Sequence, residues 1–455
     1  MAPLSPEIPK DHPLSLKYSF WDGFFAAIQM GIVDQFVTPL ALFLGAGSVW
    51  IGVLNFVRNS FVSIVQIYSS FVTQRLGSRK RFIMICVLAA ALLWLPTYLI
   101  PFLFVELRVP VFILLFTLTS SVNMLATPAW ASLVSEYIPA NKRGEYFGWR
   151  GTTLGLVYSA AVLCAGLLLH FFHGPGLFWG FFLLMAAAAV ARFLSWVFIS
   201  RLYEPAWQVK KTDSFTFLQF IGRLPVSNFA KYSVLAAMFN FFVALVSPFF
   251  AVYLLRDLGY DYFSFTLVIG ASVFTTLVFQ QYWGGFADRY GNRKIFLLNA
   301  VLIAVVPLLW LFSRRMWYLI VIQLLAGIVW AGFNLATANF IYDAVVSAKR
   351  ERCVSYYNFL SGIGLGLGAL IGGYLYHHLP ALFGHSFYLL LLLSAAGRIF
   401  TAVLIRYNVK EVRPVEPVRR RMLLYDVSGL RVMGLLTREL LFRQKQPGSE
   451  NKGQA

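Results

Sequence analysis

The stretch Asp288-Arg289-Tyr290-Gly291-Asn292-Arg293-Lys294 decides the fold of this chain, because a related stretch, Gln74-Arg75-Leu76-Gly77-Ser78-Arg79-Lys80, occurs in the same setting much earlier. Each copy follows one long hydrophobic segment and precedes another. A polar loop repeated between apolar segments indicates an internal duplication. We therefore predict two similar halves.

The composition places both halves in a lipid bilayer. Hydrophobic residues make up 59% of the 455 residues and charged residues only 13%, whereas a soluble domain is about 25% charged. Twelve apolar runs each reach the roughly 20 residues that a membrane-crossing helix needs. They lie at about 19–44, 47–73, 82–106, 110–138, 145–172, 177–202, 229–255, 263–287, 294–313, 317–345, 353–377 and 386–408. We expect an all-α integral membrane protein with 12 transmembrane helices in two pseudo-symmetric six-helix bundles.

The net charge of +19 is distributed unevenly along the chain. Most basic residues between the runs follow an even-numbered run, whereas the breaks after odd-numbered runs hold only Arg108, Arg256, Arg314 and Arg315. Basic loops stay in the cytoplasm, so both termini are expected there, in a multi-pass protein of the plasma (inner) membrane. Because the charges follow the membrane ends, they indicate orientation, and no nucleic-acid partner is expected.

The longest polar stretch between runs, 204–228, divides the chain. It predicts a cytoplasmic N-terminal segment at 1–18, a bundle at 19–203, a cytoplasmic linker at 204–228, a second bundle at 229–408 and a basic tail at 409–455. Apolar and basic side chains recur at helical spacing in the tail: Met433, Leu436 and Leu440 against Arg431, Arg438 and Arg443. This pattern predicts an amphipathic helix on anionic lipids of the inner leaflet, and a solvated tail is the alternative.

The second loop copy resembles the signature of the major facilitator superfamily of secondary transporters. That signature is Gly, three residues, Asp-Arg, one residue, Gly and then basic residues, and the matching positions are Gly284, Asp288, Arg289, Gly291, Arg293 and Lys294. The first copy has Ser70 in place of the glycine and Gln74 in place of the aspartate. The resemblance covers residues 17 to 408 and implies a cytoplasmic latch between the halves. The expected gate also includes Gln74, Arg75, Gly77, Glu136 and Asp343.

Charged side chains inside the apolar runs need a reason, because each costs about 2.5–3.5 kcal/mol near the bilayer centre. Asp34 and Arg58 lie near the middle of the first and second runs and have no charged counterpart in the second half. Such asymmetry is typical of a substrate or proton site, and an ion pair that only joins two helices is the alternative. Arg192 and Arg398 occur in both halves, which favours a scaffold role. Arg150 either reaches the interface or lines the cavity.

Uncharged polar residues complete the candidate set. In the superfamily the first, fourth, seventh and tenth helices line the path, which implies cavity positions for Gln29, Asn123, Asn240 and Asn334; hydrogen bonding between helices is the alternative. Asp22 and the aromatic residues near it fit either the cavity or helix packing and lipid contact. No metal site or cofactor is expected, and the chain has no phosphate-binding loop or nucleophile elbow.

Together these patterns predict a monomeric secondary active transporter of a small solute that works by alternating access and is not an enzyme. Arginines outnumber Asp34 within the runs, which favours an anionic or zwitterionic solute. A drug or amphiphile exporter or a lipid flippase is the alternative within transport. A non-transporting membrane scaffold or sensor is the alternative from another class.

Overall fold

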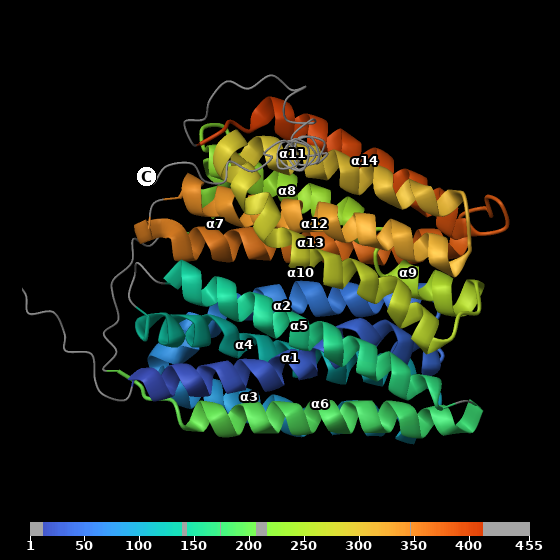
Figure 1. The fold of residues 1–455 in the computed structure, drawn as a ribbon, viewed down its shortest axis with the longest axis horizontal. Coiled ribbons are helices and arrows are strands. Elements are labelled where there is room, and N and C mark those ends of the chain that lie inside the picture. The colour runs from blue at the N-terminus through green and yellow to red at the C-terminus, as the bar shows by residue number, and fades with distance from the viewer. Residues whose placement is uncertain (1–11, 139–142, 173, 206–215, 346, 413–455) are drawn as a thin grey trace, which may run out of the picture.

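Long helices dominate the computed structural model, which describes residues 12–138, 143–172, 174–205, 216–345 and 347–412. Within these residues, 12 helices are long and apolar enough to cross a membrane. They run nearly side by side along the long axis of the molecule (Figure 1). The predicted all-α membrane architecture is confirmed.

The helices form two bundles, one below the other in Figure 1. The first bundle consists of α1 (His12–Phe43), α2 (Ser48–Leu76), α3 (Arg79–Leu99), α4 (Arg108–Glu136), α5 (Arg143–His170) and α6 (Leu177–Ser200). The second consists of α8 (Asn228–Ala244) with its continuation α9 (Phe249–Val252), then α10 (Tyr262–Tyr290), α11 (Asn292–Val305), α12 (Met316–Ala344), α13 (Ser347–His378) and α14 (Ser386–Asn408). Across the boundary, α2 packs on α13 and α5 packs on α10.

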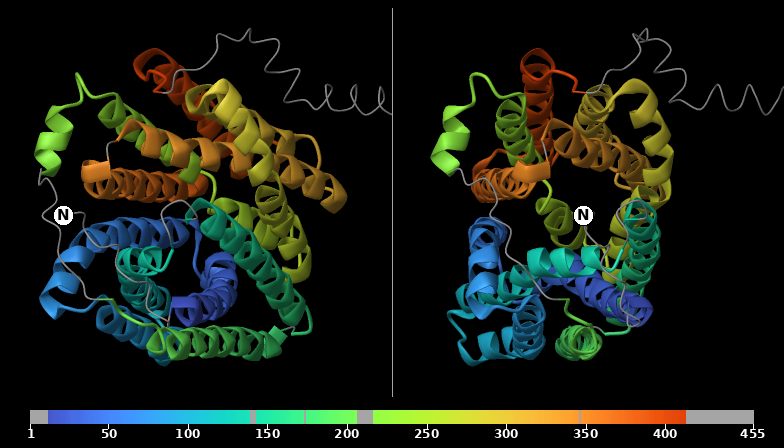
Figure 2. Two further views of the ribbon diagram at one scale, coloured as in Figure 1. Left: turned by 60° about the vertical axis from the view of Figure 1, so that its left-hand side comes forward. Right: turned by 90° about the vertical axis from the view of Figure 1, so that its left-hand side faces the viewer.

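Both loop copies lie at the end of the molecule where α1 begins and α14 ends, which we call the terminal end; the opposite end is the far end (Figure 2). Each copy turns at a glycine with positive φ, 66° at Gly77 and 89° at Gly291. Only glycine adopts such angles without strain. In the first copy Ser78 then starts α3 by accepting a hydrogen bond from the Arg81 backbone N–H. The repeated motif is therefore a tight helix-to-helix turn.

Glycines allow α13 to contact both bundles closely. A Cβ atom on Gly364, Gly368 or Gly372 would approach carbonyl oxygens of α8 or of its C-cap residue Leu245 more closely than real Cβ atoms do. On another face of α13, Gly366 and Gly373 meet α2 in the same way. Such backbone-to-backbone packing is how membrane helices associate when lipid is as apolar as their side chains. The two bundles thus share a close seam along α13.

The bundles also meet at the far end. His170 at the end of α5 lies 2.8 Å from Asp261, which caps α10. Among the side chains that the structure describes, this is the one hydrogen bond between the bundles. Burial alone would raise the pKa of Asp261, but hydrogen bonds from Ser264 and His170 outweigh it, so the pKa of this carboxyl is below its ordinary value.

The predicted linker contains one element that the sequence analysis did not foresee. Helix α7 (Phe217–Gly222) begins with a capping box, in which the Thr216 hydroxyl accepts from the Gln219 backbone and the Gln219 side chain accepts from the Thr216 backbone. Residues 1–11, 206–215 and the tail from 413 lie outside the described residues. The amphipathic tail helix and its lipid partner therefore remain predictions.

Candidate substrate cavity

A cavity of about 630 Å³ lies between the two bundles. This volume falls in the range of about 300–1,000 Å³ that is usual for small-molecule sites. Much of the lining is apolar, with Met30, Met124, Leu154, Leu277 and Trp330 contributed by both bundles. The polar lining residues are Asp22, Asn123, Thr127, Arg150, Tyr158, Arg192, Ser272, Thr276 and Asn334. The cavity thus suits a solute with an apolar body and a polar group.

Asp22 is the carboxylate of this cavity and is only 3% exposed. One oxygen, Oδ1, accepts a hydrogen bond of 2.6 Å from the Ser195 hydroxyl of α6. The other, Oδ2, accepts one of 2.8 Å from the Trp130 indole N–H of α4. A buried carboxylate must be hydrogen-bonded, and here two neutral donors meet that need.

Two arginines share the cavity with Asp22. Arg150 Nη2 donates to the Ser19 carbonyl at 3.0 Å, and its guanidinium lies 4.4 Å from the centre of the Trp130 ring. Arg192 Nη1 donates to Ser195 at 3.2 Å. Among the residues that the structure describes, no ion pair within 4.0 Å joins Asp22 to either arginine.

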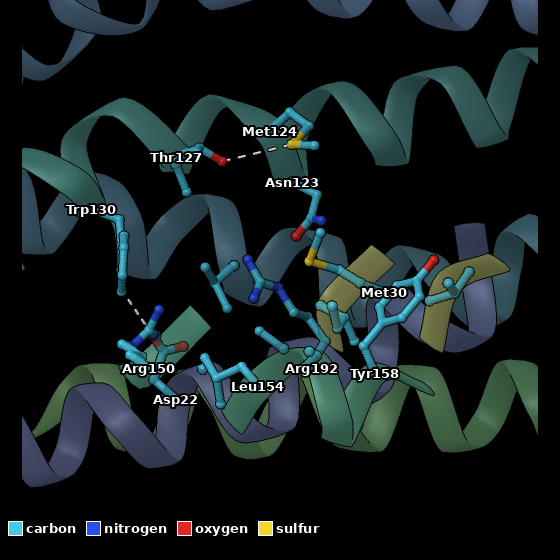
Figure 3. Close-up of a pocket in the computed structure, with 18 of the residues that line it drawn as sticks. Asp22, Met30, Asn123, Met124, Thr127, Trp130, Arg150, Leu154, Tyr158 and Arg192 are labelled. Atoms are coloured by element: carbon cyan, nitrogen blue, oxygen red, sulfur yellow. Dashed lines mark hydrogen bonds between the residues drawn. The ribbon is translucent and has the colours of Figure 1, made fainter. Parts of the chain in front are cut away.

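Neither arginine is neutralised by the carboxylate of the cavity. The Nε atoms of Arg150 and Arg192 are buried and have no hydrogen-bond partner within the described part of the chain. Figure 3 shows Arg150 beside Asp22, while Arg192 and Asn123 extend into the same space from α6 and α4. Two guanidinium groups and one carboxylate leave this region with a net positive charge.

Gly23 provides the space in which Arg150 lies. A Cβ atom at this position would be 2.8 Å from Arg150 Cζ and 2.5 Å from Leu154 Cδ1. The guanidinium therefore occupies the place of a side chain on α1, with the Trp130 ring also in contact.

Asp34 and Arg58 line a second cavity of about 410 Å³, and Met124 borders both cavities. Arg58 Nη2 donates to Asp34 Oδ1 at 2.6 Å, so the structure brings the two predicted residues together as an ion pair. The hydroxyls of Ser120 and Ser361 are buried and unpartnered among described residues, and both residues line this cavity. This second cavity is the more polar of the two and also lies between the bundles.

The remaining sequence candidates fall in different places. Asn123 and Asn334 line the first cavity, from α4 and α12. Gln29 is buried on α1, and neither it nor Asn240 is among the residues that line the two cavities described here. No group of three metal-ligating side chains occurs in the part of the chain that the structure describes.

Arg192 and Arg398 occupy equivalent helices but have different surroundings. Arg398 Nη1 donates to the Ile303 carbonyl at 2.8 Å. Pro307 follows Ile303 by one helical turn and has no N–H, so this carbonyl lacks its usual helical donor. The contacts of Arg398 fit the predicted scaffold role, whereas Arg192 lines the cavity.

The first loop copy is tied to its own bundle. Arg79 donates two hydrogen bonds to Glu136, of 2.6 and 2.8 Å. Glu204, just after α6, accepts from the Ser78 hydroxyl at 2.5 Å and from the Arg79 backbone at 2.6 Å. A carboxylate at the start of α3 is favourable because the helix N-terminus carries a partial positive charge. Glu136, expected in the gate, thus pairs within its own half.

The second copy repeats this arrangement. Asn292 Nδ2 donates to Asp343 Oδ2 at 2.6 Å, and Glu411 accepts from the Arg293 backbone at 2.9 Å. Glu204 and Glu411 were not among the residues predicted from the sequence, and each lies a few residues after the last helix of its half.

The other expected gate residues lie in or close to the two loop copies. Gln74, Arg75 and Arg289 are exposed, and Arg289 lies 5.3 Å from the Tyr290 ring. The Asp288 side chain lies outside the described residues. Gly284 and Gly291 belong to α10 and to the turn after it.

The family model of the Major Facilitator Superfamily matches residues 23–244 and 232–445. The chain belongs to the major facilitator superfamily. Its family and fold are those of multi-pass membrane transporters and not of enzymes. The resemblance noted in the loop motif is therefore confirmed.

Individual relatives are more distant. The chain is 29% identical to tetracycline resistance protein, class B, of Escherichia coli over 110 residues, 24% of this chain and 27% of that protein. The chain thus matches only about a quarter of that relative's length. In fold it is similar to a mutant of the nucleoside transporter NupG (TM-score 0.69, 13% identity, 86% of this chain and 100% of that one). A D-xylose–proton symporter gives a TM-score of 0.68 at 12% identity, covering 89% and 99%.

Proposed function

We propose that this protein is a secondary active transporter that moves a small amphipathic organic anion by alternating access. The observation that carries the proposal is the pair of arginines, Arg150 and Arg192, that line a largely apolar cavity and form no ion pair with its carboxylate among the described residues. Asp22 is already hydrogen-bonded by neutral donors, so it leaves the guanidinium groups free for a ligand. A carboxylate or sulfonate would be bound by charge-assisted hydrogen bonds, which are stronger than neutral ones.

The contact between the bundles at the far end fits one particular state of the transport cycle. Closure at the far end, through His170 and Asp261, fits a state with access from the terminal end. We assign the terminal end to the cytoplasm, which makes the described state inward-facing and places both termini inside. Cysteines introduced at Arg75 and Arg289, which are exposed positions of the two loop copies, should then resist an impermeant thiol reagent in intact cells of a cysteine-free variant and react once the membrane is permeabilised, and rapid labelling of either in intact cells would reverse the assignment.

The second cavity has a separate role in this proposal. Asp34 and Arg58 offer both signs of charge, which suits a transported proton or the head group of a zwitterionic solute. Asn123 and Asn334 face the solute from opposite bundles, so each bundle keeps one polar contact while the two rock about the site. The asymmetry of charge between the halves supports a functional role for these residues.

Uptake into proteoliposomes tests the proposal. We expect saturable uptake of radiolabelled aromatic carboxylates such as 2-naphthoate, with strong losses in Arg150→Gln and Arg192→Gln. Arg201→Gln is the matched control, because Arg201 is exposed at the end of α6, the helix that carries Arg192. Saturable uptake that survives both cavity substitutions would refute the anion site, and absence of any flux would favour a non-transporting scaffold.

Export of uncharged or cationic drugs is the second candidate, favoured by the similarity to a tetracycline resistance protein. The apolar lining of the cavity would accept such molecules. Competition separates the two candidates, because an anion site is inhibited by aromatic carboxylates and not by cationic amphiphiles of the same size. Movement of labelled phospholipid in the same vesicles would instead support a flippase.

A further inference from the structure

Trp130 contacts both of the opposite charges on one side of the cavity. Its indole N–H donates to Asp22 Oδ2 at 2.8 Å. Its ring lies 4.4 Å from the guanidinium carbon of Arg150. One side chain on α4 therefore binds a carboxylate of α1 at its edge and a cation of α5 on its face.

The position of Arg150 makes this arrangement unexpected. Its guanidinium lies over Gly23, the residue next to Asp22 in α1, yet the two charges form no ion pair within 4.0 Å among the described residues. Opposite charges this near to one another in an apolar region attract strongly. A specific contact must therefore hold the Asp22 carboxylate away from Arg150.

We infer that Trp130 is a positioning residue that keeps Asp22 and Arg150 apart and so preserves Arg150 for an anionic ligand. This inference rests on the proposed function. The indole N–H occupies the carboxylate oxygen that the Ser195 hydroxyl leaves available. The aromatic face stabilises the cation without neutralising it, which a carboxylate would do.

Loss of the N–H alone should rearrange the site. In Trp130→Phe the ring face remains, but Asp22 Oδ2 loses its donor while still buried. A buried carboxylate oxygen without a partner is costly, so Asp22 should turn to Arg150, which offers N–H groups in a fork that matches a carboxylate. The ion pair would then occupy the guanidinium and lower anion affinity.

The test combines Trp130→Phe with Asp22→Asn. Binding of 2-naphthoate to the purified protein, measured by calorimetry, should weaken at least about tenfold in Trp130→Phe, a loss of about 1.4 kcal/mol. Asp22→Asn should bind at least as well as the wild type, because it removes the competing charge. The double variant should also recover wild-type binding, since no carboxylate remains to capture Arg150.

The matched control is Trp283→Phe. Trp283 lies in the second bundle, and its indole N–H also makes one hydrogen bond of 2.8 Å, to the Ile328 carbonyl of the same bundle. It should lower thermal stability without changing naphthoate affinity. Wild-type affinity in Trp130→Phe would overturn the inference. A double variant that binds as weakly as Trp130→Phe would also overturn it, because Trp130 would then contact the ligand itself.

A second readout does not depend on the ligand. Phenylglyoxal modifies free guanidinium groups, and peptide mass spectrometry measures its rate at Arg150. We expect modification of the wild type, several-fold slower modification of Trp130→Phe, and recovery in the double variant. If this pattern appears while no variant binds naphthoate, the proposed anion transport fails and the positioning role stands. Equal rates in wild type and Trp130→Phe would refute the positioning role alone.

Discussion

Gly23→Ala should disable the proposed anion site without unfolding the protein. The new Cβ would lie 2.8 Å from Arg150 Cζ and 2.5 Å from Leu154 Cδ1, whereas ordinary contacts begin at 3.4 Å. Both neighbours are ends of flexible side chains, so the guanidinium should move and the helices should stay in place. The movement puts at risk the hydrogen bond to the Ser19 carbonyl and the contact with the Trp130 ring.

The expected size of the effect follows from these two contacts. A hydrogen bond from a charged group contributes about 1.5–3 kcal/mol, and a cation–π contact about 0.5–2 kcal/mol. A net loss of about 2 kcal/mol in ligand binding corresponds to an affinity about 30-fold weaker. Calorimetric titration of Gly23→Ala with 2-naphthoate measures this loss directly.

Gly148→Ala provides the matched control. Gly148 lies on α5 close to Arg150, and a Cβ atom there would meet nothing within 4 Å. Its affinity should equal that of the wild type. If Gly23→Ala binds naphthoate within about twofold of the wild type, a difference of only about 0.4 kcal/mol, the placement of Arg150 against α1 is not required and the site assignment is wrong.

Three further predictions follow from individual contacts. If Asp34 and Arg58 only neutralise each other, either single neutral substitution should reduce folded yield and the double substitution should restore both yield and uptake; a double variant that folds but loses concentrative uptake would place the pair in the mechanism. Arg398→Leu should lower the melting temperature, because the buried Ile303 carbonyl loses its donor at a cost of about 1–3 kcal/mol. Adding Pro307→Ala should restore part of the melting temperature by returning a backbone N–H, and no recovery would refute this explanation of the buried arginine. Asp261→Asn should destabilise the protein at neutral pH, because a lowered folded-state pKa stabilises only where the carboxyl is ionised. The difference in stability from the wild type should vanish as the pH falls below the ordinary aspartate pKa of 3.8. A loss of stability that is independent of pH in thermal-shift measurements would contradict this prediction.

The architecture could be predicted from sequence because the bilayer limits what a chain can do. Spanning segments must satisfy their own backbone, so apolar length alone identifies a helix. The repeated loop then indicates the duplication, since Gly77 and Gly291 mark turns that only glycine makes easily. For Asp34 and Arg58 the sequence left two interpretations, a substrate or proton site and an ion pair between consecutive helices; the structure pairs the two side chains, and their functional role stays a prediction.

The first cavity could not be predicted in the same way. Asp22, Trp130 and Ser195 come from three helices and meet only through tertiary packing. In a soluble helix the apolar stripe shows which face is buried. In a membrane helix the outer face is apolar too, so hydropathy does not reveal which way Asp22 points. The available signal was one carboxylate within an apolar run, and the structure was needed to supply its partners.

Because the two halves are related by duplication, the sequence predicted the same scaffold role for both buried arginines. Arg192 and Arg398 descend from equivalent positions, but the positions around them have diverged. Trp130 and Arg150 of the first bundle correspond to Thr337 and Tyr357 of the second when positions are counted from Glu136 and Asp343 and from Arg143 and Arg350. The second bundle therefore keeps an arginine that serves backbone carbonyls, while the first surrounds its arginine with a carboxylate, an indole and a second cation. Because the shared fold accounts for what is symmetric, we propose that the residues that break the symmetry are those through which this transporter selects its solute.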